Sequence, residues 1–288
     1  MTAVKRPKAK QDWRVFPAPA EGFAPYEASA RELTKHGLPQ RPETRADPHL
    51  AGLWDAVAGR YSGFTHLSPD FEGSGPAKAP IVALLSPIEN CGFSIPTTGS
   101  APFTALFIHW TVPHLVYTPA PLNKNWFHTF AGIGFLADVH VEMTVDSAGV
   151  VTSTATVNGS PVTNLPVVPG DAMSAVMCVN TQSSGGPKVF IGVANETRGQ
   201  TVNLSTTAPN LPALSVDAGV TLDLVQNNPT LNKLARFGVV YFDEISAYTT
   251  DGPRTLAVGT GTTMTDLSGK AMAHAYRLND FAFKTVYG

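Results

Sequence analysis

The residues in this sequence best suited to chemistry are histidines and an aspartate in its middle third. His109, His114, His128 and His140 lie close together in the chain, and Asp138 precedes the last of them by two positions. Imidazole and carboxylate groups can bind a metal ion or transfer protons. The spacings match no recognised metal-ligand motif, and histidines within aromatic strands are usually packed side chains. We therefore expect neither a metal site nor a cofactor.

The other residue types that support catalysis form no motif of their own. The sequence contains no G-x-S-x-G, so a nucleophile elbow is absent, although a Ser-His-Asp triad from distant segments stays open. The glycine-rich segment 252–261 lacks the order of a P-loop and is better interpreted as a hairpin loop. Cys91 and Cys178 each lie among apolar residues, which favours buried free thiols and leaves a single bridge between them open.

Composition narrows the class of protein. The 288 residues are 43% hydrophobic and 15% charged, which is typical of a globular chain. The net charge of −2 gives no electrostatic basis for binding nucleic acid or an anionic membrane. The N-terminus is basic but is followed by no apolar segment of a signal peptide, and no stretch is apolar over the ~18 residues of a membrane span. We expect a soluble, cytoplasmic protein.

The elements that would position these residues are short strands. From Pro80 onward, β-branched and aromatic runs alternate with turn signals such as Asn158-Gly159 and Pro169-Gly170-Asp171. Without long helical patterns between them, such strands favour an all-β antiparallel sandwich over βαβ units. The expected strands are 81–85, 92–95, 104–112, 127–133, 139–145, 150–157, 172–180, 188–195, 201–206, 221–226, 238–245, 271–277 and 281–287.

The first 75 residues differ in composition from the rest of the chain, because prolines frequently interrupt them. Ala28–His36 could form a helix ended by Gly37, and Pro48–Ala58 carries apolar residues at helical spacing. We expect an irregular, partly helical N-terminal arm over 1–75 and a sandwich domain over 76–288. Disordered tails are poor in aromatics, so the aromatic residues of the arm should pack it on the sandwich; these are Trp13, Phe16, Phe23 and Tyr26.

Five segments, in this order along the chain, resemble the glutamic peptidase (eqolisin) family. The similarity covers roughly residues 20–288, and the order of the segments is more specific than any one of them. They are Asn90–Ile95 (NCGFSI), His109–Pro113 (HWTVP), Phe130–Gly134 (FAGIG), Val167–Asp171 (VVPGD), and Ser215–Ala247 with its LARFGVVYF run at Leu234–Phe242.

The resemblance implies a concanavalin A/lectin-like sandwich of two curved antiparallel sheets, with the active site in the concave face. Members of the family hydrolyse peptide bonds at acid pH with a glutamate and a glutamine on neighbouring strands. A carboxyl group is needed to move protons to and from water, and a neutral amide can stabilise the tetrahedral oxygen. The resemblance thus implies a peptide or protein bound in the concave sheet.

This sequence departs from the family at both catalytic positions. When Thr221–Gln226 is laid on the family strand, the catalytic glutamate falls on Gln226, and an amide cannot accept and return a proton. The strand after Gly-Ile-Gly offers no glutamine, and the spacing to the turn favours Ala137 or Asp138 there. A reciprocal exchange, with Glu142 as the carboxyl and Gln226 as the amide, would still supply both groups. The plainer alternative is a solvated or ion-paired Glu142 and a loop-end Gln226.

The resemblance and the departures from it leave three functions open. The first is a divergent glutamic-peptidase-like protein whose endopeptidase activity is altered, or lost as in a pseudoenzyme. The second is a non-catalytic module that binds a peptide or glycan, and the third is a structural or assembly protein of unspecified oligomeric state. For the first two, the concave face would be lined by aromatic and polar side chains, for which the candidates are Trp110, Trp126, Phe127, Asp138 and His140.

Overall fold

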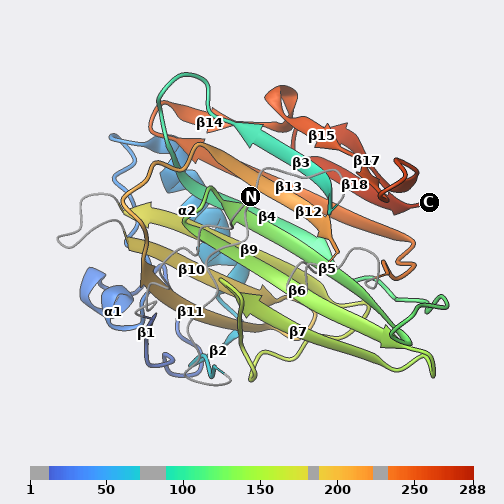
Figure 1. The fold of residues 1–288 in the computed structure, drawn as a ribbon. Coiled ribbons are helices and arrows are strands. Elements are labelled where there is room, and N and C mark those ends of the chain that lie inside the picture. Colours follow the sequence, from blue (N-terminus) through green and yellow to red (C-terminus); the bar gives the residue numbers. More distant parts are fainter. Residues whose placement is uncertain (1–12, 72–88, 181–187, 223–232) are drawn as a thin grey trace.

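The computed structural model describes residues 13–71, 89–180, 188–222 and 233–288. Within these ranges the strands form two sheets that pack face to face as a β-sandwich (Figure 1). Every pairing between these strands is antiparallel except that of β2 with β11. No helix in the described ranges is both long and apolar enough to cross a membrane.

We call the eleven-stranded sheet the large sheet. Its main path runs in the order β1-β11-β10-β9-β4-β13-β18-β17-β16, with β14 paired to β13 and β2 paired to β11. Its strands are β1 (Trp13–Val15), β2 (Thr65–Leu67), β4 (Phe103–Thr111), β9 (Ala172–Asn180), β10 (Lys188–Asn195), β11 (Gln200–Thr207), β13 (Val239–Thr249), β14 (Gly252–Arg254), β16 (Met264–Thr265), β17 (Ala271–Asn279) and β18 (Ala282–Tyr287).

The seven-stranded sheet, the small sheet, has the order β15-β3-β12-β5-β6-β7-β8. Its strands are β3 (Asn90–Pro96), β5 (Lys124–Ile133), β6 (Ala137–Asp146), β7 (Val151–Val157), β8 (Ser160–Pro161), β12 (Ser215–Thr221) and β15 (Thr260–Thr262). A 3₁₀ turn, η1 (Leu256–Val258), lies between β14 and β15.

The hydrophobic core lies between the two sheets. Successive side chains of a strand point to opposite faces, so each strand of the small sheet contributes every second residue to the core. On β6, Val139 and Val141 are fully buried in this core, whereas His140 and Glu142 lie on the opposite face. The turn at Asn158-Gly159, predicted from its sequence, is confirmed: both residues have positive φ, which suits the tight hairpin between β7 and β8.

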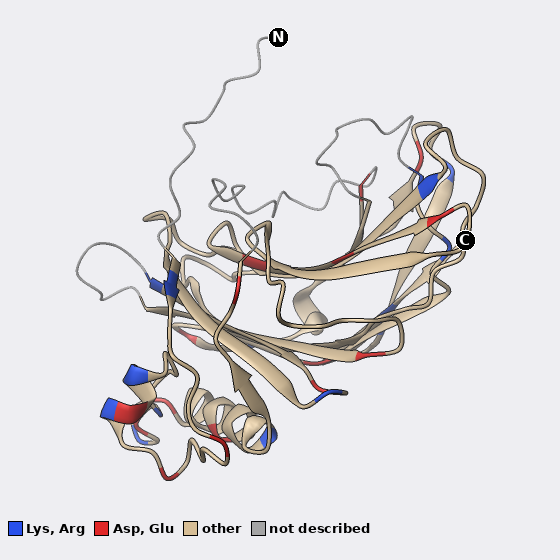
Figure 2. Ribbon diagram, turned by 90° about the horizontal axis from the view of Figure 1, so that it is seen from below, with Lys and Arg blue, Asp and Glu red and all other residues tan. Residues whose placement is uncertain are grey.

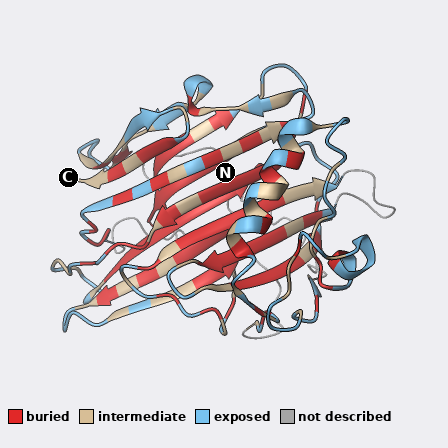
Figure 3. Ribbon diagram, turned by 180° about the vertical axis from the view of Figure 1, so that it is seen from behind, coloured by how far each residue is buried: buried red, intermediate tan, exposed pale blue. Residues whose placement is uncertain are grey.

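The arm contains the two predicted helices. Helix α1 (Ala30–Lys35) begins at a capping box in which Ser29 and Glu32 bond each other's backbone N–H groups, and α2 (Pro48–Tyr61) begins at Asp47. Helix α2 packs on the outer face of the large sheet (Figure 3). The edge view in Figure 2 shows the two sheets as layers with the helices outside one of them.

Of the aromatic residues expected to pack the arm on the sandwich, Trp13 packs against the core between the sheets and also stacks on Phe71. The ring contacts of Phe23 and Tyr26 lie within the arm itself: Phe23 meets the rings of His36 and His66 edge-on, and Tyr26 packs on Trp54. Phe16 is buried. The arm also adds β1 and β2 to the large sheet, both beside β11.

The strand expected over 221–226 begins six residues earlier than predicted, at Ser215, and ends at Thr221. Its inward residues Val216, Ala218 and Val220 are short, and Asp217, Ala218 and Gly219 are all residue types of low strand preference. For this reason the sequence pattern did not predict a strand at Ser215–Thr221 and favoured the more aliphatic residues that follow it. Residues 223–226 and the expected strand 81–85 lie outside the described residues.

Candidate functional site on the small sheet

The face of the small sheet turned away from the core carries a row of polar side chains, and we call this the polar face. Strand pairing places Thr221 of β12 opposite His128 of β5, and His128 opposite Glu142 of β6. Thr154 of β7 continues the row. Directly opposed side chains in antiparallel strands have Cβ atoms about 4.5–5.5 Å apart, so an imidazole and a carboxyl group are neighbours here.

Glu142 is held by its surroundings. The Thr156 hydroxyl donates a hydrogen bond to Glu142 Oε1 at 3.2 Å. The rings of His128 and His140 meet edge-to-face with centroids 6.2 Å apart, and Phe130 packs beside His140 at 5.9 Å. The carboxyl group therefore shares one surface with two imidazoles whose orientation is fixed by packing.

Two further carboxyl groups lie along the same strands. Asp217 of β12 and Asp138 of β6 are both opposite Gly132 of β5, which places no side chain between them. Asp138 Oδ1 lies 3.7 Å from His140 Nε2. The polar face thus combines carboxyl groups on two strands with imidazoles on the two strands at its centre.

Asp217 is an unusual strand residue because it is only 4% exposed. Burial raises the pKa of its carboxyl group, and hydrogen bonds from the Ser94 and Ser215 hydroxyls, the latter at 2.7 Å, partly oppose that rise. A buried acid with a raised pKa can hold a proton where ordinary aspartates cannot. Groups of this kind are concentrated at functional sites.

Near Asp217, β12 and β3 approach each other through two glycines that carry no side chain. Gly219 of β12 and Gly92 of β3 are opposite each other in the pairing. A Cβ atom on Gly219 would lie 2.2 Å from the Cys91 carbonyl oxygen, and one on Gly92 would lie 2.1 Å from the Ala218 carbonyl oxygen. No other residue fits these positions without a backbone shift, so the close approach of β3 and β12 depends on both glycines.

Residues 89–280 match the family model described as the Peptidase A4 family. This chain belongs to the Peptidase A4 family. The match spans the small sheet and most of the large sheet, and it begins after the arm.

Two solved structures have a similar fold to this Peptidase A4 member. Scytalido-glutamic peptidase, solved with a transition state analog inhibitor, aligns with a TM-score of 0.54 and 13% identity over 69% of this chain and 98% of that chain. SCP-B, a member of the eqolisin family solved with the tripeptide Ala-Ile-His, aligns with a TM-score of 0.55 and 13% identity over 71% and 100%. No curated protein matches the sequence. At this identity the structural likeness establishes the fold.

The polar face brings together several of the residues predicted for a peptidase-like site. Glu142, Asp138 and His140 all lie on it. Trp126, two positions before His128 on β5, alternates onto the same face but is 8% exposed and packs with the main cluster of buried apolar residues. Gln226, the other predicted catalytic residue, lies outside the described residues.

The expected placement of Trp110 on the ligand-binding face is corrected by the structure. Trp110 belongs to β4 of the large sheet and is 1% exposed in the core between the sheets. Phe127, on the inward face of β5, is likewise buried in that core. Neither ring can reach a ligand on the polar face, since both sit on the far side of the small sheet's backbone.

Two residues of the polar face were not singled out from sequence. Asp217 and Thr221 alternate with Val216, Ala218 and Val220, which is the pattern of a strand with one polar face. That alternation was the available signal. It was missed because the strand was expected to begin at Thr221.

The histidines grouped by sequence separate in space. His128 and His140 share the polar face, His114 is exposed in the segment after β4, and His109 lies on the outer face of the large sheet. Among the described residues, no three His, Cys, Asp or Glu side chains gather closely enough to hold a metal ion. Burial alone would lower the pKa of His109, but its hydrogen bond to Asp243 at 2.5 Å and the charge of Glu196 raise it.

Proposed function

We propose that this Peptidase A4 protein is a peptide-bond hydrolase of altered acid chemistry. In this proposal Glu142 is the general acid/base, and the imidazolium group of His128 takes the role of a neutral amide in stabilising the oxyanion. The observation that carries it is the direct opposition of Glu142 and His128 on β6 and β5, with the Thr156 hydroxyl on Glu142 Oε1. It differs from the exchange predicted from sequence, in which Gln226 supplies the second group.

The proposed reaction needs one proton acceptor and one positive hydrogen-bond donor. The Glu142 carboxylate removes a proton from water as the water oxygen attacks the peptide carbonyl carbon. His128 donates a hydrogen bond to the oxygen that becomes negative in the tetrahedral intermediate. Glu142 then returns the proton to the departing nitrogen as the C–N bond breaks.

The proposed chemistry requires Glu142 as the carboxylate and His128 as the imidazolium at the same time. Activity should therefore fall when Glu142 is protonated at low pH and when His128 loses its proton at high pH. The expected pH profile is bell-shaped.

The proposed substrate is a peptide in extended form across the small sheet. SCP-B, a relative with the same fold, has been solved with a tripeptide. Trp126, Asp138 and His140 lie on the polar face with Glu142 and are proposed to contact the peptide. Gly132 leaves the floor between Asp217 and Asp138 without a side chain.

Digestion of casein across the acid range tests the proposal. Glu142→Gln should lower kcat by about 10²- to 10⁴-fold, the usual contribution of a general acid/base. Glu244→Gln, a glutamate of β13 in the large sheet, is the matched control and should keep activity. His128→Gln retains a hydrogen-bond donor without a charge, so it should keep part of the activity and lose the alkaline limb of the pH profile, whereas His128→Leu should lose activity.

Failure of the folded wild type to cleave casein at any pH would refute the hydrolase. Saturable binding of casein peptides without cleavage would instead support the non-catalytic binding module, which the amide at position 226 favours. A defined oligomer by size-exclusion chromatography with light scattering, with neither binding nor cleavage, would support the assembly protein.

A further inference from the structure

Two buried histidines lie where the arm meets the outer face of the large sheet, on the opposite side of the sandwich from the polar face. His66 belongs to β2 and His36 is the C-cap of α1, and each is 8% exposed. The Phe23 ring meets both of them edge-on, with its centroid 6.2 Å from that of His66 and 5.4 Å from that of His36. The arm thus encloses two imidazoles in one packed cluster.

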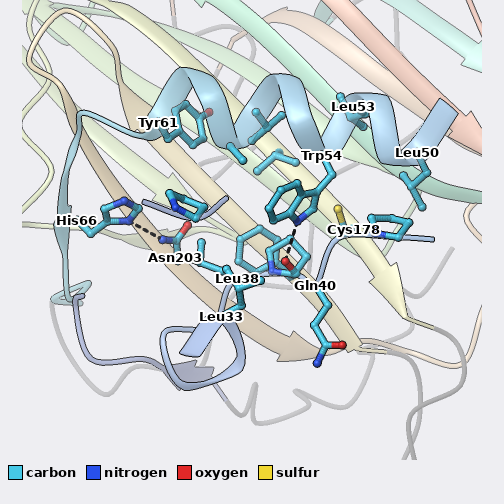
Figure 4. A pocket seen from close by; sticks show the side chains of 17 residues that line it. Leu33, Leu38, Gln40, Leu50, Leu53, Trp54, Tyr61, His66, Cys178 and Asn203 are labelled. Atoms are coloured by element: carbon cyan, nitrogen blue, oxygen red, sulfur yellow. Dashed lines mark hydrogen bonds between the residues drawn. The ribbon is translucent and has the colours of Figure 1, made fainter. Parts of the chain in front are cut away.

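The surroundings of His66 suit only its neutral form. Asn203 of β11 donates a hydrogen bond from Nδ2 to His66 Nδ1 at 3.2 Å (Figure 4), so the single proton of the neutral ring is on Nε2. Nε2 is buried and has no hydrogen-bond partner within the described part of the chain. A second proton would go onto Nδ1, where it would face the amide N–H of Asn203, a donor against a donor.

No carboxylate balances a positive charge at this position. In the ranges that the structure describes, neither His66 nor His36 belongs to an ion pair. The titratable groups beside His66 are His36 and Tyr61 of α2, and burial raises the pKa of the Tyr61 hydroxyl, which therefore stays neutral. Glu32 acts on the charge of His36 only from the exposed surface of α1, where the Ser29 backbone and hydroxyl bond to it. A buried charge without a partner is costly, so protonation opposes burial of His66.

The direction of the pH effect follows from the pKa in the two positions of the arm. Burial, together with the charge of His36, lowers the pKa of His66 to about 4 when the arm is docked. In an undocked arm water would solvate the ring, and its pKa would return to about 6.5. Between these values the undocked arm binds more protons than the docked arm, so falling pH favours undocking.

We propose that His66 is a pH-sensitive switch by which mild acid loosens the arm from the outer face of the large sheet. At neutral pH the uncharged ring stays buried beside β11, and in acid the charged ring moves into water together with β2. Helix α2 follows, because only three residues separate its end at Tyr61 from the start of β2 at Thr65. The switch lies across the sandwich from the polar face, so it does not depend on the proposed hydrolysis.

Hydrogen–deuterium exchange of the full chain at pH 7 and pH 5, corrected for the intrinsic pH dependence of amide exchange, tests the switch. Opening of α2 and β2, measured relative to β6 of the small sheet, should be about 20-fold more frequent at pH 5. Ordinary carboxylates are still ionised at this pH, so the ion pairs of the arm persist. In His66→Phe the ring is never charged and the increase should disappear. His49→Phe, which removes an exposed histidine of α2, is the matched control and should keep it.

A second variant tests the same position without removing the histidine. Asn203→Asp would place a carboxylate beside His66 Nδ1, where a protonated ring can donate a charge-assisted hydrogen bond. The opening in acid should then be lost from the folded variant. Equal opening at pH 7 and pH 5 in the wild type, a wild-type increase in folded His66→Phe, or opening of β6 together with α2 would each overturn the proposal.

Discussion

The ion pair at the end of α2 should contribute measurably to holding the arm on the sandwich. Arg60, in the last turn of α2, donates two hydrogen bonds to the Glu244 carboxylate of β13, at 2.6 and 2.7 Å. Its Nε lies 3.4 Å from Glu196, and its guanidinium lies 5.4 Å from the centre of the Phe107 ring. We predict a favourable coupling between Arg60 and Glu244 in the free energy of unfolding.

The magnitude follows from geometry and exposure. Hydrogen bonds to charged groups contribute about 1.5–3 kcal/mol when shielded, but exposed pairs contribute about 0.2–1 kcal/mol. The Glu244 side chain is 53% exposed and that of Arg60 is 27% exposed, so solvent screens one end of the pair. The bidentate arrangement favours the upper part of the exposed range, and we expect about 1 kcal/mol.

A double-mutant cycle with Arg60→Met and Glu244→Gln, measured by urea unfolding at neutral pH, gives this coupling directly. Molar salt should reduce it, since screening weakens exposed pairs. A coupling under about 0.3 kcal/mol, or one insensitive to salt, would contradict the argument.

The backbone conformation of Glu244 gives a separate prediction about steric strain at this position. Glu244 has a φ of +52° at an irregularity between β13 and β4, a conformation that glycine adopts without the steric cost of a side chain. In the Arg60→Met background the charge has no arginine partner, so Glu244→Gly should be about 0.5–1 kcal/mol more stable than Glu244→Gln. Equal stability of the two variants would mean that the positive φ at position 244 carries no steric cost.

Two further substitutions test the geometry of the polar face. The folded-state pKa of Asp217 is raised, so its contribution to stability is fully present below the ordinary pKa of 3.8 and is lost as pH rises through the folded pKa. Wild type should therefore gain stability relative to Asp217→Asn as pH falls toward 4 in urea unfolding, and a constant difference would argue against a raised pKa. Gly219→Ala should destabilise by about 1–3 kcal/mol or more because its Cβ meets the Cys91 carbonyl oxygen. Gly63→Ala, with nothing within 4 Å of its added Cβ, is the control; equal thermal unfolding temperatures for the two variants would contradict the close approach of β3 and β12.

Local signals in the sequence predicted the two N-terminal helices and most strands correctly. The start of α1 is encoded by Ser29 and Glu32, and its end by Gly37, whose φ of +69° suits glycine. These features depend on a few neighbouring residues, so they can be read without knowing the rest of the fold. The family resemblance, carried by the order of five segments, is confirmed by the family match over 89–280.

The faces of the central strands could not be predicted in the same way. Strand β4 is covered on both sides, by the inter-sheet core and by α2, so Ala105, Leu106, Phe107 and Ile108 are all buried. A continuous apolar run carries no alternation to show which side Trp110 faces. Only the packing of α2, distant in sequence, decides that Phe107 points toward the arm and Trp110 toward the core.

The pairing of β1 and β2 with β11 means that the arm also closes an edge of the large sheet. The two short strands cover Leu204–Thr206 and Gln200–Val202 of β11 on the side away from β10. Without them, the backbone N–H and C=O groups of β11 would be open to another chain, and exposed edges of this kind promote edge-to-edge association. The arm therefore helps to keep separate copies of this protein from joining through their sheets.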